Sequence, residues 1–179
     1  MPTTNSFLQR LVGAAALDVA IYEDVEADRS ATAQAFVVVL LSSLAGGLGV
    51  SGLTGGPINL AFFSAVALLA WCAWALLTYT IGVHLLPEPQ TRADVGELLR
   101  TIGFASTPGL LRVLGIMTPL AKPVLAVTAV WMLAAMVVAV RQALDYKSTG
   151  RAIAVCVIGW TLAIAFAVAF GLMFSPALS

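Results

Sequence analysis

Few residues of this chain have the type and spacing that chemistry requires, and Ser51 is the first candidate. Gly49-Val50-Ser51-Gly52 matches the G-x-S-G nucleophile pattern of intramembrane serine proteases, in which a histidine base must lie within hydrogen-bond reach of the serine. The single histidine, His84, ends the next long apolar run. If that run crosses a bilayer, His84 and Ser51 lie about 30 Å apart. Glycine packing at a helix end explains the pattern, so we predict no catalytic residue and no enzyme.

A compact acidic cluster precedes the first long apolar run. It consists of Glu23, Asp24, Glu26 and Asp28. Carboxylate oxygens suit hard cations, but the spacing matches no calcium-binding loop. We interpret the cluster as a solvated acidic turn that caps the first span and faces basic loops. Its four carboxylates are candidate interaction residues, and we predict no metal ion and no cofactor.

Arg112 is the sharpest single candidate, because it interrupts an apolar segment that Pro108 and Gly109 also break. An ionisable side chain inside a span costs about 2.5–3.5 kcal/mol to insert, so it usually has a partner or a function. In one interpretation Arg112 snorkels, or pairs with Asp94, Glu97 or the acidic cluster, and ties its segment to the cytoplasmic layer. In the other it lines an anion or substrate path, since transporters build sites at broken helices.

Cysteines and tryptophans fall inside the apolar runs. Cys72 and Cys156 are predicted to lie at different depths, which favours two free thiols over a disulfide. Trp71 and Trp74 lie in the middle of one run. They either fill gaps between helices or line a groove for a hydrophobic ligand.

Long hydrophobic helices must position these residues. The chain has 179 residues, 60% hydrophobic and 10% charged, with a mean hydropathy of +0.99. A soluble domain carries about 25% charged residues, and a bilayer takes about 20 apolar residues to span. Apolar runs lie near 31–53, 58–85, 124–140 and 152–175, with a shorter, interrupted one at 104–119. The composition predicts an all-α polytopic membrane bundle, and the zero net charge argues against nucleic acid as a partner.

The positions of Lys and Arg predict the topology. If residues 104–119 cross and the N-terminus is cytoplasmic, seven positive residues lie inside and one, Lys122, lies outside. The seven are Arg10, Arg29, Arg92, Arg100, Arg141, Lys147 and Arg151. If the segment returns, the ratio falls to six against three. The positive-inside rule therefore predicts five spans, with the third short and broken and the C-terminus outside.

Two shorter helices are expected at the cytoplasmic surface. One covers residues 5–22, with Arg10, Asp18 and Tyr22 away from its apolar side. The other opens at the capping-box pattern Thr91-Arg92-Ala93-Asp94, and Arg92, Glu97 and Thr101 are expected to face water. We therefore divide the chain into a cytoplasmic segment, 1–30, and a transmembrane domain, 31–179.

Small residues recur at four-residue steps in two of the expected spans. They are Ser42, Ser43, Gly46 and Gly47 in the first, and Gly159, Ala163, Ala167 and Gly171 in the last. Such faces let helices approach closely in lipid. We expect them to pack within the chain, against membrane-protein partners, or against a second copy.

Several stretches resemble bacterial members of the Yip family. Tyr22-Glu23-Asp24-Val25-Glu26-Ala27-Asp28, followed by Ser30-Ala31-Thr32-Ala33-Gln34-Ala35, is similar to the start of the family's first span. Leu98-Leu99-Arg100-Thr101-Ile102-Gly103-Phe104-Ala105 and Pro108-Gly109-Leu110-Leu111 resemble the family's third segment. Val137-Val138-Ala139-Val140-Arg141-Gln142-Ala143-Leu144 with Ser148-Thr149-Gly150-Arg151-Ala152 is similar to its fourth loop. The likeness covers most of residues 15–175.

This resemblance implies five transmembrane helices with a cytoplasmic N-terminus. Eukaryotic members bind prenylated small GTPases in vesicle traffic, but their Asp-Leu-Tyr-Gly-Pro-type motif is missing from this chain. We expect a non-enzymatic adaptor, assembly factor or accessory subunit in the bacterial plasma membrane, whose partners are the lipid bilayer and other membrane proteins. The alternative is a small transporter or channel that uses Arg112 and the broken third helix.

Overall fold

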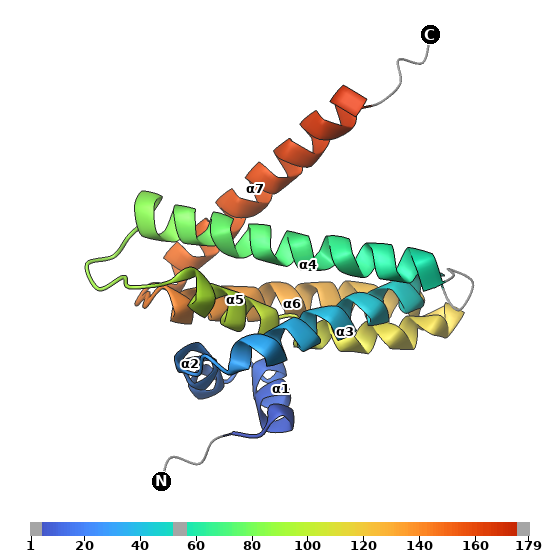
Figure 1. Ribbon diagram of the computed structural model, residues 1–179, viewed down its shortest axis with the longest axis horizontal. Helices are drawn as coiled ribbons and strands as arrows, with labels where there is room; N and C mark the ends of the chain where they lie inside the picture. Colours follow the sequence, from blue (N-terminus) through green and yellow to red (C-terminus); the bar gives the residue numbers. More distant parts are fainter. Residues whose placement is uncertain (1–4, 52–56, 175–179) are drawn as a thin grey trace.

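The long hydrophobic runs form helices, as predicted. The computed structural model describes residues 5–51 and 57–174, and within these ranges every regular element is a helix (Figure 1). Four helices are long and apolar enough to cross a membrane: α3 (Ala31–Ser51), α4 (Pro57–Tyr79), α6 (Ala121–Ala143) and α7 (Thr149–Phe174). This is the architecture of a helical membrane bundle, and the all-α expectation is confirmed.

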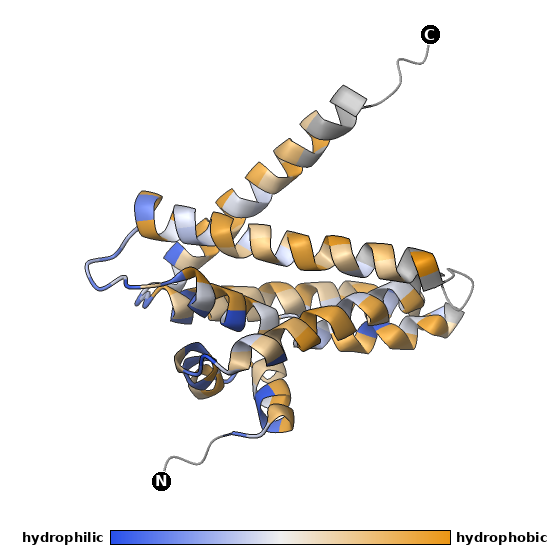
Figure 2. Cartoon of the chain, in the orientation of Figure 1, coloured by the Kyte–Doolittle hydropathy of each residue, from blue (hydrophilic) through white to orange (hydrophobic). Residues whose placement is uncertain are grey.

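Shorter elements complete the described chain. They are α1 (Phe7–Ala15), α2 (Val19–Ala27), the π-helix η2 (Thr80–Leu85) that continues α4, α5 (Val95–Phe104), and the 3₁₀ helices η3 (Thr107–Ile116) and η4 (Thr118–Leu120). Hydrophilic residues gather on α1, on α2 and around the loop between α4 and α5 (Figure 2). We call this side the charged end: α2, the N-terminal half of α5, and the loops 86–94 and 144–148.

The N-terminal segment contains two helices, so the prediction of one helix over 5–22 was wrong. Leu17 has a φ of 62°, which reverses the chain, and the Asp18 carboxylate then accepts a hydrogen bond from the Ala20 amide at 3.0 Å to start α2. The turn folds α2 back against α5 and α6. As a result Arg10 and Tyr22, which were expected on the polar side, are buried.

Helix α5 begins later and lies deeper than predicted. Its capping box is formed by Asp94 and Glu97 rather than by Thr91, with the Glu97 amide donating to the Asp94 carboxylate at 2.8 Å. Thr101 was expected to face water but is fully buried, because α5 packs among α2, α3, α4 and α6. Its hydroxyl is satisfied by the Glu97 carbonyl at 3.0 Å.

The interrupted segment 104–119 forms η3, which runs beside α3 in the same direction. Glycines mark the close approaches: a Cβ on Gly103 would lie 2.7 Å from the Ala35 Cβ, and one on Gly115 would lie 2.9 Å from the Gly49 oxygen. Residues Gly103 to Gly115 therefore span the same length of the bundle as the longer stretch from Ala35 to Gly49. A 3₁₀ helix rises about 2.0 Å per residue against 1.5 Å in an α-helix, which explains how a short segment covers this depth.

Two loops lock together at the charged end. The Tyr146 hydroxyl lies 2.9 Å from the Gly82 carbonyl oxygen and 2.8 Å from that of Leu86, so the two carbonyls share its one proton. Glu88 accepts a hydrogen bond from the Lys147 amide at 3.0 Å and pairs with Arg151 at 3.4 Å. The ends of η2 and α6 and the start of α7 are thereby held in one arrangement.

Helix α7 leaves the bundle along its length (Figure 1). Val155 and Cys156 are buried near its start, and Gly159 lies against the Trp74 ring. Farther along, Leu162 and Phe166 are exposed. Both Cys72 and Cys156 are free thiols, as the sequence predicted.

Candidate functional site

Arg10 organises the acidic cluster, which belongs to helix α2 and its C-terminal end. Its Nε donates to Asp24 at 2.8 Å and its Nη2 to Asp28 at 2.7 Å, while Nη1 reaches the Gln34 amide oxygen at 3.1 Å. Hydrogen bonds from Ser30 and Arg10 lower the pKa of Asp28 to about 2. The prediction of a solvated acidic turn was therefore wrong for Asp24 and Asp28. These two carboxylates bind the Arg10 guanidinium, whose side chain is only 1% exposed.

Glu23 and Glu26, the other two carboxylates, have no ion pair in the described chain. Glu23 accepts a hydrogen bond from the Gln142 amide at 3.2 Å. Glu26 lies near Arg100, but that guanidinium donates to the backbone carbonyls of Val25 and Glu26 rather than to the carboxylate. Burial, together with the negative charges of Glu97, Asp145 and Glu23, raises the pKa of Glu26 to about 7. Within residues 5–51 and 57–174, no three metal-ligating side chains converge.

Arg112 projects from η3 onto α3. A Cβ on Gly46 would lie 3.6 Å from its Cδ and 3.8 Å from its Nη1, so glycine leaves the room that the side chain occupies. Its Nε donates to the Thr128 hydroxyl on α6 at 3.4 Å. The three ion pairs of the described chain do not include Arg112.

The acids expected to pair with Arg112 are engaged elsewhere. Asp94 and Glu97 form the capping box of α5. Asp24 and Asp28 bind Arg10. The prediction that Arg112 pairs with one of these acids was therefore wrong. Arg112 lies at the level of Gly46 and Gly49 on α3, near the end of the bundle opposite the charged end.

A cavity of about 340 Å³ lies beside Arg112 at mid-length of the bundle. Residues of α3, α4, α5, η3 and α6 line it. Its polar side chains include Ser42, Ser43, Ser106 and Arg112, and its apolar walls include Trp71 and Met132. The sequence pointed to Arg112 but not to the serines, because helical spacing alone does not tell which faces of separate helices meet.

Trp74 also lines this cavity and carries an unsatisfied polar atom. Its Nε1 is buried and has no hydrogen-bond partner among the described residues, whereas the Trp71 Nε1 donates to the Leu99 carbonyl at 3.1 Å. The Trp74 ring stacks on Trp160 with centroids 6.2 Å apart. Trp74 and Ala70 line a second, apolar cleft of about 700 Å³ between α4 and α7 as well, so the two hollows share a wall.

Pro108 and Gly109 build the frame of the cavity. Pro108 stands at the first turn of η3, where its missing N–H costs no hydrogen bond. A Cβ on Gly109 would lie 2.1 Å from the Ser42 hydroxyl and 3.0 Å from the Met132 sulfur. These two candidates from the sequence are therefore positioning residues, since they let η3 pack between α3 and α6.

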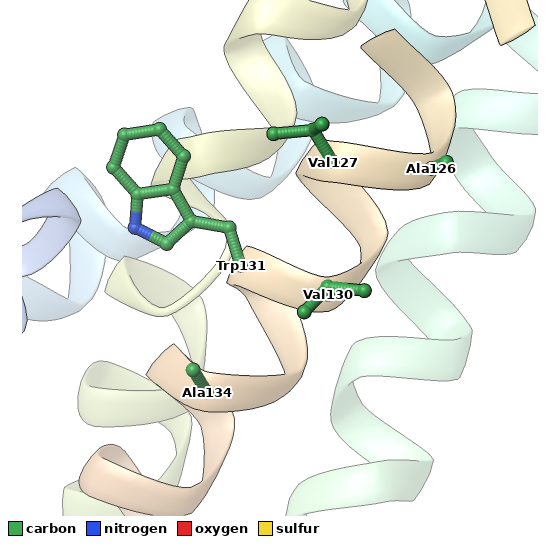
Figure 3. A pocket seen from close by; sticks show the side chains of 5 residues that line it. All are labelled: Ala126, Val127, Val130, Trp131 and Ala134. Atoms are coloured by element: carbon green, nitrogen blue, oxygen red, sulfur yellow. The ribbon is translucent and has the colours of Figure 1, made fainter. Parts of the chain in front are cut away.

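A third hollow, on the outer face of α6, is lined by apolar side chains. Figure 3 shows its five lining residues, all from one helix, with the Trp131 ring projecting to one side. The hollow measures about 510 Å³. The Trp131 Nε1 donates to the Ala15 carbonyl at 2.7 Å, which ties α6 to the end of α1. The lining offers no charged group to orient a ligand, so it has the character of a lipid-facing surface.

Ser51 and His84 lie at opposite ends of neighbouring helices. Ser51 ends α3, and His84 lies in η2 at the far end of α4. The His84 ring is exposed and contacts the Tyr79 ring, with centroids 5.7 Å apart. Gly52 and the side chain of Ser51 lie outside the described residues.

The four helices of membrane length, joined at a folded charged end, are compatible with a helical integral membrane protein. No family model, no curated protein and no solved structure matches this chain.

Proposed function

We propose that this chain is a non-enzymatic integral membrane protein resembling the Yip family, which acts as an adaptor, assembly factor or accessory subunit in the bacterial plasma membrane. The observation that supports this proposal is the folded charged end. Arg10 fixes α2, Arg100 binds the end of α2, and the Glu88–Arg151 pair fixes the two loops. Such a surface presents one arrangement to a partner, so little ordering entropy is lost on binding.

Exposed charges of both signs make this end suitable for a polar partner surface. Those at the charged end include Glu23, Arg92, Asp145 and Lys147. Complementary charges of this kind give specificity and speed association more than they add affinity.

We also propose five crossings with the N-terminus in the cytoplasm. Support comes from η3, which follows α3 from Ala35 to Gly49, and from α6, whose Thr128 meets Arg112 while Gln142 meets Glu23 at the charged end. With this orientation the charged end faces the cytoplasm, in agreement with the positive-inside rule.

Purification of the tagged protein from its native membrane in mild detergent tests the adaptor role. We expect a stoichiometric larger complex, which Arg92→Glu combined with Lys147→Glu disrupts, since both residues are exposed at the charged end. Lys122→Glu, an exposed lysine after η4, is the matched control and should leave the complex intact. A lone monomer or homo-oligomer at native expression would contradict the adaptor role.

The cavity beside Arg112 favours the second candidate function, a small transporter or channel. A charge at a broken helix beside a cavity is the arrangement on which transport sites are built. In proteoliposomes, Arg112→Gln should then abolish anion flux while the protein stays folded. Absence of flux through the native protein would remove this candidate.

A further inference from the structure

The charge of Arg112 is not neutralised within the described chain. A guanidinium has five N–H donors, and only the Nε–H of Arg112 has a described acceptor, the Thr128 hydroxyl at 3.4 Å. That hydroxyl is itself engaged, since it donates to the Val124 carbonyl at 2.8 Å. The Nη1 and Nη2 groups are left to bind an acceptor from outside the protein, and an anion would also neutralise the charge.

A hydroxyl lies one helical turn from the guanidinium. Nη1 lies over Gly46, and Ser42 precedes Gly46 by one turn on the same face of α3. Ser42 is 4% exposed, lines the cavity, and has no hydrogen-bond partner among the described residues. A head group on Arg112 can therefore receive a second hydrogen bond from Ser42.

The remaining walls suit a hydrocarbon chain. Trp71, Trp74, Met132 and Met136 line the cavity, and methionine adapts to irregular apolar ligands. The volume of about 340 Å³ falls at the lower end of the range for small-molecule sites, about 300–1,000 Å³. The α4–α7 cleft, which shares Trp74 with the cavity, adds apolar surface for a longer chain.

We propose that this cavity binds an anionic amphiphile, with a carboxylate or phosphate monoester on Arg112 and Ser42 and an acyl chain along Trp71 and Trp74. A free inorganic anion fits less well, because most of the lining is apolar and offers little to replace its hydration. The inference goes beyond the adaptor role and does not depend on it.

Tryptophan quenching by 12-bromododecanoate tests the proposal on the full-length protein in nanodiscs of phosphatidylcholine. We expect saturable quenching, because the brominated chain reaches Trp71 and Trp74. Replacing both by Phe should greatly reduce the saturable part; Trp160, which lies 6.2 Å from Trp74 between ring centroids, reports any remainder, and Trp131 reports unspecific partition into lipid. Dodecanoate and dodecyl phosphate should compete, and dodecanol, which has the chain without the charge, should compete at least tenfold more weakly.

Arginine variants distinguish binding that depends on the charge of Arg112 from unspecific binding to an apolar surface. Arg112→Gln should weaken binding at least tenfold, whereas Arg112→Lys should retain part of it and Arg92→Gln, an exposed arginine outside the cavity, should change nothing. Equal binding by Arg112→Gln, or equal competition by dodecanol, overturns the proposal. Competition by inorganic phosphate as strong as that by dodecyl phosphate also overturns it, because the site then takes a free anion.

A second variant keeps the test valid if Arg112→Gln does not fold. Ala67→Leu leaves Arg112 in place and narrows the cavity from α4. We expect it to weaken binding of dodecanoate at least fivefold in a protein that elutes as a single species. Unchanged binding by this variant would also overturn the proposal.

Discussion

Arg10 is buried with its charge neutralised, whereas Arg112 is half-buried without a carboxylate partner in the described chain. Both are arginines among apolar helices, and they differ in what surrounds the guanidinium. Arg10 meets two carboxylates because the turn at Leu17 brings α2 back beside α1. Arg112 meets glycine and threonine beside a cavity that serines also line, so the first residue serves structure and the second is available to a ligand.

Removing Arg10 should loosen the N-terminal helices. Arg10→Met leaves Asp24 and Asp28 without a cation, and we expect a loss of about 2 kcal/mol, less than for a fully buried pair because both carboxylates are 27% exposed. Arg29→Met, at an exposed residue, is the control and should stay within about 0.5 kcal/mol. Equilibrium unfolding in mixed micelles measures the change, and equal losses for both variants would contradict the role of Arg10.

Glu26 should make the docking of α2 sensitive to pH. Its folded pKa of about 7 lies above its ordinary value of 4.5, so its contribution to stability is fully present below pH 4.5 and is lost as the pH rises through 7. The facing charges are Glu23, Glu97, Asp145 and Arg100. After solvent screening we expect a loss of about 1–2 kcal/mol between pH 4.5 and 8.

Hydrogen exchange of the α2 amides at both pH values measures this loss, once the intrinsic pH dependence of exchange is removed. Glu26→Gln cannot ionise and should abolish the difference. A native α2 whose corrected protection does not change with pH, or a variant that retains the difference, would contradict the burial of this carboxyl.

At the scale of the elements, the small residues of α3 allow η3 to pack closely. A Cβ on Gly49 would lie 2.1 Å from the backbone oxygen of Arg112, so a side chain there forces the two helices apart. We expect Gly49→Ala to cost about 1–3 kcal/mol in a detergent unfolding assay. Gly150→Ala in the first turn of α7 is the control, because its Cβ would meet Ser148 at an ordinary 3.6 Å.

A neutral or stabilising Gly49→Ala would show that η3 does not pack on α3 as described. The same result would undermine the cavity, whose polar wall depends on the position of η3. Gly150→Ala is expected to be neutral or slightly stabilising, because alanine has the higher helix propensity.

The long helices were predictable because length and hydropathy decide them, and α3, α4, α6 and α7 follow the apolar runs closely. The break between α1 and α2 at Leu17 could not be predicted. Positive φ is usually indicated by a glycine or an asparagine, and here the residue with positive φ is a leucine. Burial of Thr101 depends on four surrounding helices, which no periodicity in α5 encodes. For the candidate site, Arg112, Pro108 and Gly109 were visible as exceptions in an apolar segment, whereas Ser42 and Ser106 acquire their place from tertiary packing.

At the scale of the whole molecule, the paths of η3 and α6 predict where each loop meets water. Between η3 and α6 the chain turns at the end of the bundle opposite the charged end, so Lys122 should face outside while Lys147 faces the cytoplasm. In a Cys72→Ala, Cys156→Ala background, a membrane-impermeant maleimide should label Lys122→Cys in intact cells. Lys147→Cys should react only after permeabilisation, although it too is exposed.

This pair of labels discriminates between the two paths that the sequence left open for residues 104–119. If the segment entered the membrane and returned, α6 would start on the cytoplasmic side, and Lys122→Cys would be protected while Lys147→Cys was labelled. Arg92→Cys, in the loop before α5, should be protected in either case and reports leakage. Labelling of Lys122→Cys alone would support five crossings. The loops 86–94 and 144–148, which contacts of Tyr146 and Glu88 hold together, would then both lie in the cytoplasm, where a cytoplasmic partner can bind them.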